Sequence, residues 1–395
     1  MRFGVNTLFL VPGDVGGTEI YLRENLRAMV SLLHEEADEH RLLLFTSRDN
    51  DEVLRDDLAA SGRVDFVRLP LRSACRPCRI VAEQTLLPLV LQRHQPDVLW
   101  SPGYTAPLWP PCPQAVTVHD LQYRSHPDDM SRLELVTLDV LVRGACRWAQ
   151  RIIAVSSFSR DELVRHGLAP ARRVQVVYGG VDPAFAQPRS VLASPVADLA
   201  GTPEPYLLCV AHSYPHKQLH RLVEAFALLE DRLPHHLVLV GKARRGEALL
   251  QQALTRLRSP GRVHRLHSIA HAELIGLFQG ASLLVLPSVY EGFGLPVLEA
   301  LMAGVPVVTN RLASLPEVGG EHAVYAEAPT AEALAGAILH VCGWSVTERV
   351  QRVRAGRAYA SRFTWRASAR STLALLRELV PDAVQGRWAS SGEDV

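Results

Sequence analysis

A chain of 395 residues is too long for one ordinary hydrophobic core, so about two domains are expected. Apolar residues make up 48% of the sequence, which is ample for burial, and no apolar run approaches the ~20 residues needed to span a bilayer. The formal net charge is +1, so charge gives no support for nucleic-acid binding.

The first half of the chain alternates strand-like and helix-like segments. Short apolar runs predict strands near 2–8, 41–46, 63–68, 97–101, 115–118, 151–155 and 173–177. Amphipathic stretches predict helices over 18–33, 79–93, 131–149 and 157–167. We interpret the apolar N-terminus as the first strand rather than a signal peptide, because a glycine-rich turn and an amphipathic helix follow it directly. A cytoplasmic protein is therefore expected.

The second half repeats this alternation. Its predicted strands lie near 206–210, 236–240, 262–266, 282–286, 305–308 and 322–325. Its predicted helices cover 217–230, 246–257, 271–280, 296–303 and 330–341, and beyond residue 345 the pattern is helical only, through about 380. This order predicts an α/β fold in which helices cover both faces of parallel sheets.

The predicted division into domains follows from a change in composition. Residues 186–205 are rich in Pro, Ala, Ser and Gly, which favours an interdomain linker, and 386–395 are predicted to be a frayed tail. We expect Rossmann-like, doubly wound domains over 1–190 and 191–365. Such sheets bind ligands at the carboxyl ends of their strands, so the two domains are predicted to face a cleft that holds the site.

The cysteines and acidic residues give no metal pattern. Cys75 and Cys78 stand close together, but a zinc site needs a second pair of similar spacing, and the sequence has none. A redox pair is an alternative, although a cytosolic setting favours reduced, structural thiols. Asp49-Asn-Asp51 fits a short metal-binding pattern, yet Asp residues also cap helices readily. We predict no metal site and no bound cofactor.

Two loops in the first half are candidate site loops. Gly16, Gly17 and Thr18 follow the first strand and open a helix, where paired glycines allow close backbone approach and a helix N-terminus attracts phosphate. The spacing matches neither G-x-G-x-x-G nor a P-loop, so a plain tight turn is equally consistent. His119-Asp120 ends a strand, where a neutral imidazole either binds a sugar hydroxyl, moves a proton, or only satisfies its own strand end.

The position of one of the chain's few lysines indicates a further candidate site loop. The chain has 42 lysines and arginines together, of which only Lys217 and Lys242 are lysines. Lys217 ends the segment that begins at His212, after the first strand of the second half. A cation is mildly unfavourable where a helix begins, so a bound phosphate would account for it. The alternative is an exposed lysine without a ligand.

Two glutamates give the most informative motif. Glu291 and Glu299 stand with seven residues between them, the first in the loop after a predicted strand and the second on the opening turn of the next helix. Pro296 suits the first position of that helix. Ionised carboxylates accept hydrogen bonds from vicinal hydroxyls, which favours a polyol ligand. A solvated loop with one acid near a helix N-terminus is the alternative.

With these loops assembled, the chain closely resembles the retaining, GT-B-fold glycosyltransferases of family 4 (glycosyl transferases group 1), and in particular mannosyltransferases. The resemblance rests on segments that occur in the family's order. They are Gly16-Gly17-Thr18, Val118-His119-Asp120-Leu121, Ile153-Ala-Val-Ser-Ser157, Tyr178-Gly-Gly-Val-Asp182, Lys217, Glu291 to Glu299, and Phe363-Thr-Trp365. Two departures stand out: Ala211-His212 replaces the family's frequent Gly-Arg, and Gly179 replaces a frequent Asn.

The resemblance implies roles for particular residues. Glu291 would contact the donor sugar, backbone groups of Phe293, Gly294 and Leu295 would hold sugar and phosphate, and Glu299 would bind the ribose. Lys217, with His212 in place of arginine, would bind the diphosphate, and Gly16-Gly17 would contact it from the opposite domain. His119 would lie by donor sugar and acceptor. The resemblance also implies that residues 366–395 contain a helix that crosses back to the N-terminal domain, with Trp365 marking its start.

The implied activity is transfer of a sugar from GDP-mannose or a UDP-sugar to a hydroxyl of a saccharide or lipid-linked acceptor, with retention of configuration. Such enzymes build surface polysaccharides or glycolipids, so peripheral contact with the inner face of the membrane is expected. Two alternatives stay open on the residues alone: a nucleotide-sugar epimerase on the same fold, and a non-catalytic module that binds sugar nucleotides.

Overall fold

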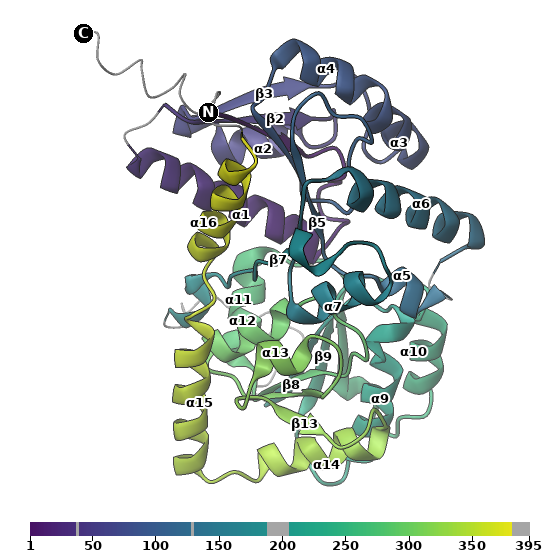
Figure 1. Cartoon of the computed structure of the whole chain (residues 1–395). Coiled ribbons are helices and arrows are strands. Elements are labelled where there is room, and N and C mark those ends of the chain that lie inside the picture. The colour runs from purple at the N-terminus through teal and green to yellow at the C-terminus, as the bar shows by residue number, and fades with distance from the viewer. Residues whose placement is uncertain (37–38, 128–129, 188–204, 381–395) are drawn as a thin grey trace. The chain divides into compact units, whose positions relative to one another are not determined.

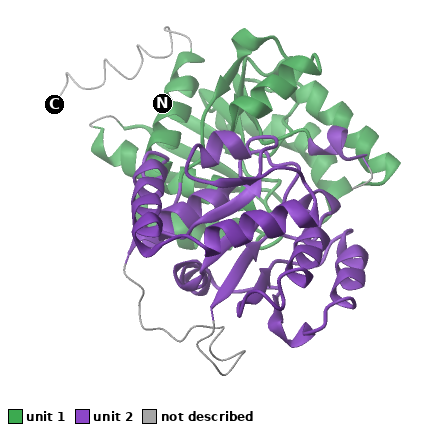
Figure 2. Ribbon diagram, turned by 90° about the horizontal axis from the view of Figure 1, so that it is seen from below, with its two compact units in different colours: residues 1–121, 130–180, 364–395 green, residues 122–129, 181–363 purple. Residues whose placement is uncertain are grey.

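The computed structural model describes residues 1–36, 39–127, 130–187 and 205–380. Within these ranges the chain forms two compact units (Figure 2). Unit 1 contains residues 1–121, 130–180 and the segment from Thr364 onward, and unit 2 contains residues 122–129 and 181–363. The predicted domain division between residues 190 and 191, most of the predicted linker and the predicted tail lie outside the described residues.

In the described part of unit 1, seven parallel strands form one sheet in the order β3-β2-β1-β4-β5-β6-β7. These strands are β1 (Arg2–Asn6), β2 (Arg41–Thr46), β3 (Val64–Arg68), β4 (Val98–Ser101), β5 (Gln114–Val118), β6 (Arg151–Ala154) and β7 (Val174–Val176). The chain moves outward from β1 to β3 and then returns to place β4 on the other side of β1. The point where the order reverses therefore lies between β1 and β4, which is where open sheets of this type bind ligands.

Apart from α16, which follows all the strands, the described helices of unit 1 connect these strands (Figure 1). They are α1 (Gly17–Glu35), α2 (Asp51–Leu58), α3 (Arg76–Gln84), α4 (Leu86–His94), α6 (Arg132–Trp148), α7 (Ser157–Arg165) and α16 (Trp365–Glu378). The predicted single helix over 79–93 is wrong in one respect, because it is broken at Thr85. Pro88 explains the break, since its ring clashes with the carbonyl of residue 84 in a continuous helix.

Helix α16 returns the end of the described chain to unit 1, where it packs along α1 (Figure 1). Arg366 pairs with Glu35, and Arg377 pairs with Glu36. The ring of Trp365 meets that of Tyr21 edge-on, with centroids 6.1 Å apart. The N-terminal and C-terminal elements of the described chain thus belong to one packed body.

Unit 2 repeats the same architecture. Its sheet, within the described residues, has six parallel strands in the order β10-β9-β8-β11-β12-β13. The strands are β8 (Tyr206–Val210), β9 (His236–Val240), β10 (Val263–Leu266), β11 (Leu283–Leu286), β12 (Val307–Asn310) and β13 (Val324–Ala326). The order reverses between β8 and β11, which pair directly.

The described α-helices of unit 2 are shorter on average than α1 or α6. They are α5 (Gln122–Ser125), α9 (Leu219–Ala227), α10 (Glu247–Leu254), α11 (His271–Gly280), α12 (Leu295–Ala303), α13 (Leu315–Gly319), α14 (Ala331–Cys342) and α15 (Val346–Ala360). Helices α9, α10 and α14 bury Leu222, Leu250 and Ile338 against one face of the sheet. Removing such surface from water is the main stabilising contribution to the unit.

Candidate functional site

Lys217 and Glu291 form the centre of the candidate site in unit 2. Lys217 ends a single 3-10 turn (Pro215–Lys217) that follows β8, and Glu291 lies in the loop after β11. The Nζ atom of Lys217 lies 2.7 Å from Oε2 of Glu291. The side chain of Lys217 is 19% exposed and that of Glu291 is 12% exposed. Because β8 and β11 flank the reversal of strand order, this ion pair stands where doubly wound sheets bind ligands.

The loop that carries Glu291 is fixed by hydrogen bonds from three polar side chains. The Ser288 hydroxyl donates to Oε1 of Glu291 at 2.7 Å. The Ser314 hydroxyl reaches the carbonyls of both Glu291 and Phe293 at 2.8 Å. From the end of β12, Asn310 donates to the carbonyl of Pro287 at 2.7 Å. These contacts hold the carboxylate in one place before any ligand binds, which reduces the entropy lost on binding.

Gly294 shapes the turn between this loop and α12. Its φ is +103°, a conformation that residues with a Cβ rarely adopt, and it forms the N-cap of α12. The predicted helix start at Pro296 is one residue late, because α12 begins at Leu295. Phe293 is buried and Leu295 is half-buried. No side chain caps this helix start, Pro296 has no N–H, and the N–H of Val297 donates to the carbonyl of Gly294 at 3.0 Å. Among the first three residues of α12, the N–H of Leu295 is therefore the donor that an anionic ligand could meet.

Glu299 lies in the interior of α12 and is only 6% exposed. Burial raises the pKa of its carboxyl to about 7, an effect that nearby His271 reduces and nearby Asp182 adds to. His271 Nε2 and Asp182 Oδ2 are themselves 2.9 Å apart. Within the described residues, Glu299 shares no ion pair or hydrogen bond with Lys217 or Glu291. Lys217 and Glu291 are therefore in contact with each other, and Glu299 is a separate, buried acid.

His212 and the loop after β9 are connected through the backbone. The N–H of Lys242 donates to Nδ1 of His212 at 3.0 Å, and the N–H of Ser213 donates to the carbonyl of Lys242 at 3.1 Å. Gly241, at φ +145°, makes this approach feasible, because a Cβ there would lie 2.3 Å from the carbonyl oxygen of Ala211. Since Nδ1 is an acceptor, neutral His212 carries its proton on Nε2.

Sequence reasoning missed several side chains that build this site. Besides Ser288, Asn310 and Ser314, it missed the part played by Cys209, which is 1% exposed at the end of β8. Burial raises the pKa of the Cys209 thiol to about 12, with the charges of Glu291, Lys217 and Arg265 acting on it. The thiol is therefore a neutral neighbour of the ion pair. Single serines and cysteines carry no spacing signal, so only coordinates could find them.

In unit 1, His119 follows β5 and is 8% exposed. Its Nε2 donates to the carbonyl of Pro102, the residue after β4, at 2.8 Å. Burial lowers its pKa, while the bond to Pro102 and the charge of Asp120 act in the opposite direction. The rings of Tyr21 and Tyr104 lie with centroids 4.9 and 5.2 Å away. His119 is therefore a neutral imidazole whose Nδ1 is its accepting nitrogen.

Gly16 forms the N-cap of α1 with a φ of +56°, so a glycine is required there. No side chain caps this helix start; Gly17 is exposed and Thr18 half-buried. The carboxylate of Glu19, in the first turn, instead accepts a hydrogen bond from the N–H of Gly13 at 2.7 Å. The loop between β1 and α1 thus ends in a turn whose helix start has no capping side chain.

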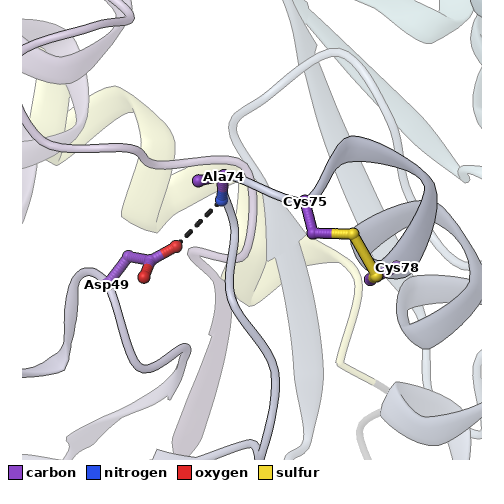
Figure 3. Close-up of a disulfide and its surroundings, with 4 residues drawn as sticks. All are labelled: Asp49, Ala74, Cys75 and Cys78. Atoms are coloured by element: carbon purple, nitrogen blue, oxygen red, sulfur yellow. Dashed lines mark hydrogen bonds between the residues drawn. A yellow bond between two sulfur atoms is a disulfide. The ribbon is translucent and has the colours of Figure 1, made fainter.

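The interpretation of the cysteines as reduced thiols is wrong for one pair. Cys75 and Cys78 form a disulfide at the start of α3 (Figure 3), and the other four cysteines form no disulfide within the described residues. The pairing is feasible because Cα atoms three residues apart at a helix start lie 5.3 Å apart here, within disulfide reach. Beside it, Asp49 accepts a hydrogen bond from the N–H of Ala74 at 2.8 Å (Figure 3).

Each half of the chain matches a family of glycosyltransferases. Residues 15–185 match the family described as "Glycosyltransferase Family 4", and residues 204–343 match "Glycosyl transferases group 1". The chain belongs to this glycosyltransferase family. Its two parallel-sheet units are the two Rossmann-like domains of the GT-B fold, as the sequence predicted.

Curated relatives include mannosyltransferases. The chain is 30% identical over 254 residues to "O-antigen chain mannosyltransferase B" of Escherichia coli, an alignment that covers 63% of this chain and 66% of that protein. It is 27% identical over 213 residues to "O-antigen chain mannosyltransferase RfbU" of Salmonella typhimurium, covering 54% and 56%. The chain thus spans somewhat less than two thirds of these relatives.

Solved structures agree on the fold. The Anabaena protein HepE, solved in complex with UDP-glucose, superposes with a TM-score of 0.74 at 21% identity over 96% of this chain and 100% of that one. WaaG, described as a glycosyltransferase involved in lipopolysaccharide biosynthesis, gives a TM-score of 0.68 at 17% identity, over 95% and 99%. Among the helices of the described ranges, none combines the length and apolarity needed to cross a bilayer.

Proposed function

We propose that this glycosyltransferase moves a sugar from a nucleotide-diphosphate donor to a hydroxyl of a saccharide or lipid-linked acceptor, with retention of configuration. GDP-mannose is the favoured donor, because the curated relatives named above are mannosyltransferases. A UDP-sugar is the second choice. The setting would be surface polysaccharide or glycolipid synthesis at the cytoplasmic side of a membrane.

The Lys217–Glu291 ion pair carries this proposal. A nucleotide-sugar presents hydroxyls and a charged diphosphate side by side, and the pair offers one acceptor and one cation 2.7 Å apart. On donor binding, Glu291 would accept from sugar hydroxyls and Lys217 would turn to the diphosphate. The ion pair is thereby exchanged for two charge-assisted contacts, so neither charge is left buried without a partner.

Lys217 would also assist the chemical step. The bond from the anomeric carbon to the diphosphate breaks, the bond to the acceptor oxygen forms on the same face, and the acceptor proton passes to the departing diphosphate. Negative charge grows on the leaving group during this step, and a fixed ammonium stabilises that charge in a site of low water content. Retention of configuration is part of the proposal and follows from the family resemblance.

The other residues would hold the donor. Glu299, once ionised, would accept from the ribose hydroxyls, and His212 would donate to phosphate through Nε2. Backbone groups of Phe293, Gly294 and Leu295, where the loop enters α12, would contact the sugar and phosphate. From unit 1, Gly16 and Gly17 would contact the diphosphate and His119 the donor sugar and acceptor. No metal or cofactor enters this scheme.

A donor screen with product analysis tests the proposal. The melting temperature of the full chain is measured with GDP-mannose, UDP-sugars and ADP-sugars, since a ligand at about 100 times its Kd stabilises by about 2.7 kcal/mol. NMR of the product formed from the best donor and an acceptor then gives the anomeric configuration. A new sugar nucleotide formed from donor alone would indicate an epimerase. Binding without turnover on any acceptor would indicate a non-catalytic module.

A further inference from the structure

Two arginines of unit 1 line an open pocket at the carboxyl ends of β2 and β3. The pocket is formed by Arg48, Arg68, Leu69 and Pro70 and has a volume of about 360 Å³. Arg68 is the last residue of β3, and Arg48 stands two residues after the end of β2. Small-molecule sites have volumes of roughly 300–1,000 Å³, so the pocket has room for a ligand the size of a sugar.

Backbone hydrogen bonds hold the two segments that carry these arginines side by side. The N–H of Leu69 donates to the carbonyl of Thr46 at 2.8 Å, and the N–H of Arg48 donates to the carbonyl of Leu71 at 2.9 Å. Thr46 and Arg68 are partners in the register of the sheet. The pairing of β2 with β3 thus continues past the strand ends, so both arginines stand on a fixed backbone.

The pairing of charges differs between the two ends of these strands. At the start of β2, Arg41 pairs with Asp65 of β3, 2.7 Å away. At the carboxyl end, Arg48 and Arg68 are exposed, and neither forms an ion pair within the described residues. Guanidinium groups that line one pocket repel each other, and a bound anion would offset this repulsion.

The aspartates of the loop after β2 have other partners. Asp49 accepts a hydrogen bond from the N–H of Ala74 at 2.8 Å (Figure 3). Asp51 accepts from the hydroxyl of Thr46 and pairs with Arg55, 2.8 Å away. Neither carboxylate neutralises the two arginines by direct contact, so the pocket keeps its positive charge.

The chemistry of this pocket suits a charged sugar. Each arginine presents planar N–H donors in a fixed fork, which matches two oxygens of a carboxylate or a phosphate. Leu69 and Pro70 add apolar surface, against which the C–H face of a sugar ring can pack. A few polar groups beside apolar side chains are typical of sites for small organic ligands rather than for bare ions.

The place of the pocket in the sheet indicates which part of an acceptor it would hold. Strands β1 and β4 separate β2 from β5, the strand that His119 follows. Neighbouring strands lie ~4.8 Å apart, so the ends of β2 and β5 are roughly 14 Å apart. In the function proposed above, the uncharged hydroxyl that accepts the sugar lies near His119. An anionic group in the pocket would therefore belong to a different sugar of the same acceptor chain.

We propose that the Arg48–Arg68 pocket is a subsite for an anionic oligosaccharide acceptor, in which a carboxylate or phosphate of a distal sugar binds both arginines. This inference rests on the function proposed above, because it names the class of acceptor used in that reaction. A charged sugar can bind the subsite without donor, so the two kinds of binding can be measured separately.

Saturation-transfer difference NMR of the full chain tests the subsite with three probes that share one sugar ring. Glucose 6-phosphate and glucuronate should bind, whereas glucose should bind about tenfold more weakly, because it offers no charge to the arginines. Arg48→Gln combined with Arg68→Gln should weaken binding of both charged probes about tenfold. Arg68→Lys should weaken it about threefold, since lysine keeps the charge but not the fork of donors.

Arg93→Gln is the matched control in the same unit. Arg93 is exposed and forms no ion pair within the described residues, but it lies in the last turn of α4, near the amino end of β4. This variant should bind the charged probes as the wild type does. Equal losses in Arg93→Gln and in the double variant would overturn the proposal, as would equal binding of glucose and the charged probes by the wild type.

Donor binding distinguishes failure of this proposal from failure of the proposed function. The donor found in the screen should raise the melting temperature of the double variant as much as that of the wild type. If it does so but no charged probe binds, the subsite alone is refuted. If charged probes bind but no donor stabilises the chain, the proposed function alone is refuted.

Two further outcomes would overturn the subsite. Displacement of the charged probes by the donor would mean that they occupy the donor site. Loss of binding to phosphatidylglycerol vesicles in the double variant, with unchanged binding of the charged sugars, would assign the two arginines to lipid headgroups instead.

Discussion

The two units share one architecture but carry different charges where their strand order reverses. In unit 2 this point holds an ammonium and a carboxylate in direct contact, with a second, buried carboxyl on α12. In unit 1 it holds the glycine turn after β1 and a neutral histidine bound to the carbonyl after β4. Of the side chains assigned to the site, unit 2 therefore supplies a charged pair and unit 1 a neutral imidazole, on which the carboxylate of Asp120 also acts.

This contrast indicates a division of labour. Fixed charges act strongly on a charged ligand and on charge that develops during a reaction, whereas neutral donors and acceptors mainly orient hydroxyls. In the function proposed above, unit 2 would hold the nucleotide diphosphate and unit 1 an uncharged acceptor group. If this is correct, substitutions in unit 2 should impair turnover more than substitutions of comparable size in unit 1.

The largest effect is expected for Lys217→Ala. Removal of one group that stabilises developing charge should reduce kcat by ~10²-fold or more. Lys217→Arg should restore part of the rate, since it keeps the charge but not the compact shape of the ammonium. Arg232→Ala, at an exposed cation of unit 2, is the control and should change kcat little. Steady-state kinetics with the donor found in the screen gives the answer, and equal losses in the two alanine variants would refute the role of Lys217.

Glu299 should make the stability of the protein depend on pH. Its pKa is raised from 4.5 to about 7 in the folded protein, so its contribution to stability is greatest below pH 4.5 and is lost as pH rises to about 7. Glu299→Gln removes this loss, which is on the order of 3 kcal/mol above pH 7. The melting temperature of the variant without donor should therefore match wild type near pH 4.5 and exceed it near pH 8. A constant difference across this range would contradict the assignment.

A smaller effect is expected in unit 1 for His119→Gln. The amide can still donate to Pro102, but the accepting ring nitrogen is lost, so kcat should fall about tenfold. Because burial lowers the pKa of His119 from 6.5, the wild-type rate should show no loss from its protonation near pH 6.5. His34→Gln, at an exposed position near the end of α1, serves as the control. A loss larger than that of Lys217→Ala would remove the proposed asymmetry between the units.

Hydrophobic periodicity was sufficient for most of the fold. The predicted strand near 236–240 is β9 itself, and the one near 41–46 is β2, because buried parallel strands are short apolar runs between turn residues. The run 305–308 was placed two residues early, because Val305 and Pro306 continue the apolar run before β12 begins at Val307, although the carbonyl of Pro306 already accepts from the N–H of Leu284 in β11. Periodicity alone does not show where pairing begins.

The site was predictable only in part, and for a physical reason. Lys217 and Glu291 stand out because their charges follow strands that the topology brings together. Ser314, which fixes the Glu291 loop, could not be found, since a short hydroxyl side chain has many uses and its partners are backbone carbonyls distant in sequence. The burial of Glu299 was also missed, because charge in the sequence does not reveal how much water reaches it.

The cysteine pair was interpreted wrongly because spacing alone does not decide between a dithiol and a disulfide. Removal of this disulfide should affect stability and turnover less than any other substitution proposed here. The bond closes a loop of only a few residues within the start of one helix, so Cys75→Ser with Cys78→Ser should lower the free energy of unfolding by on the order of 1 kcal/mol. The adjoining segment stays attached through Ser73 and through Asp49, whose hydrogen bonds do not involve sulfur.

For the same reason the kcat of this double variant should remain within about twofold of wild type, with Cys112→Ser, at a free cysteine, as the control. Chemical denaturation gives the stability, and alkylation before and after reduction shows by mass whether the pair is oxidised in the purified protein. A large loss of turnover would mean that the start of α3 positions a substrate. The chemistry of unit 1 would then extend beyond His119 and the glycine turn, and the contrast between the two units would have to be redrawn around this loop.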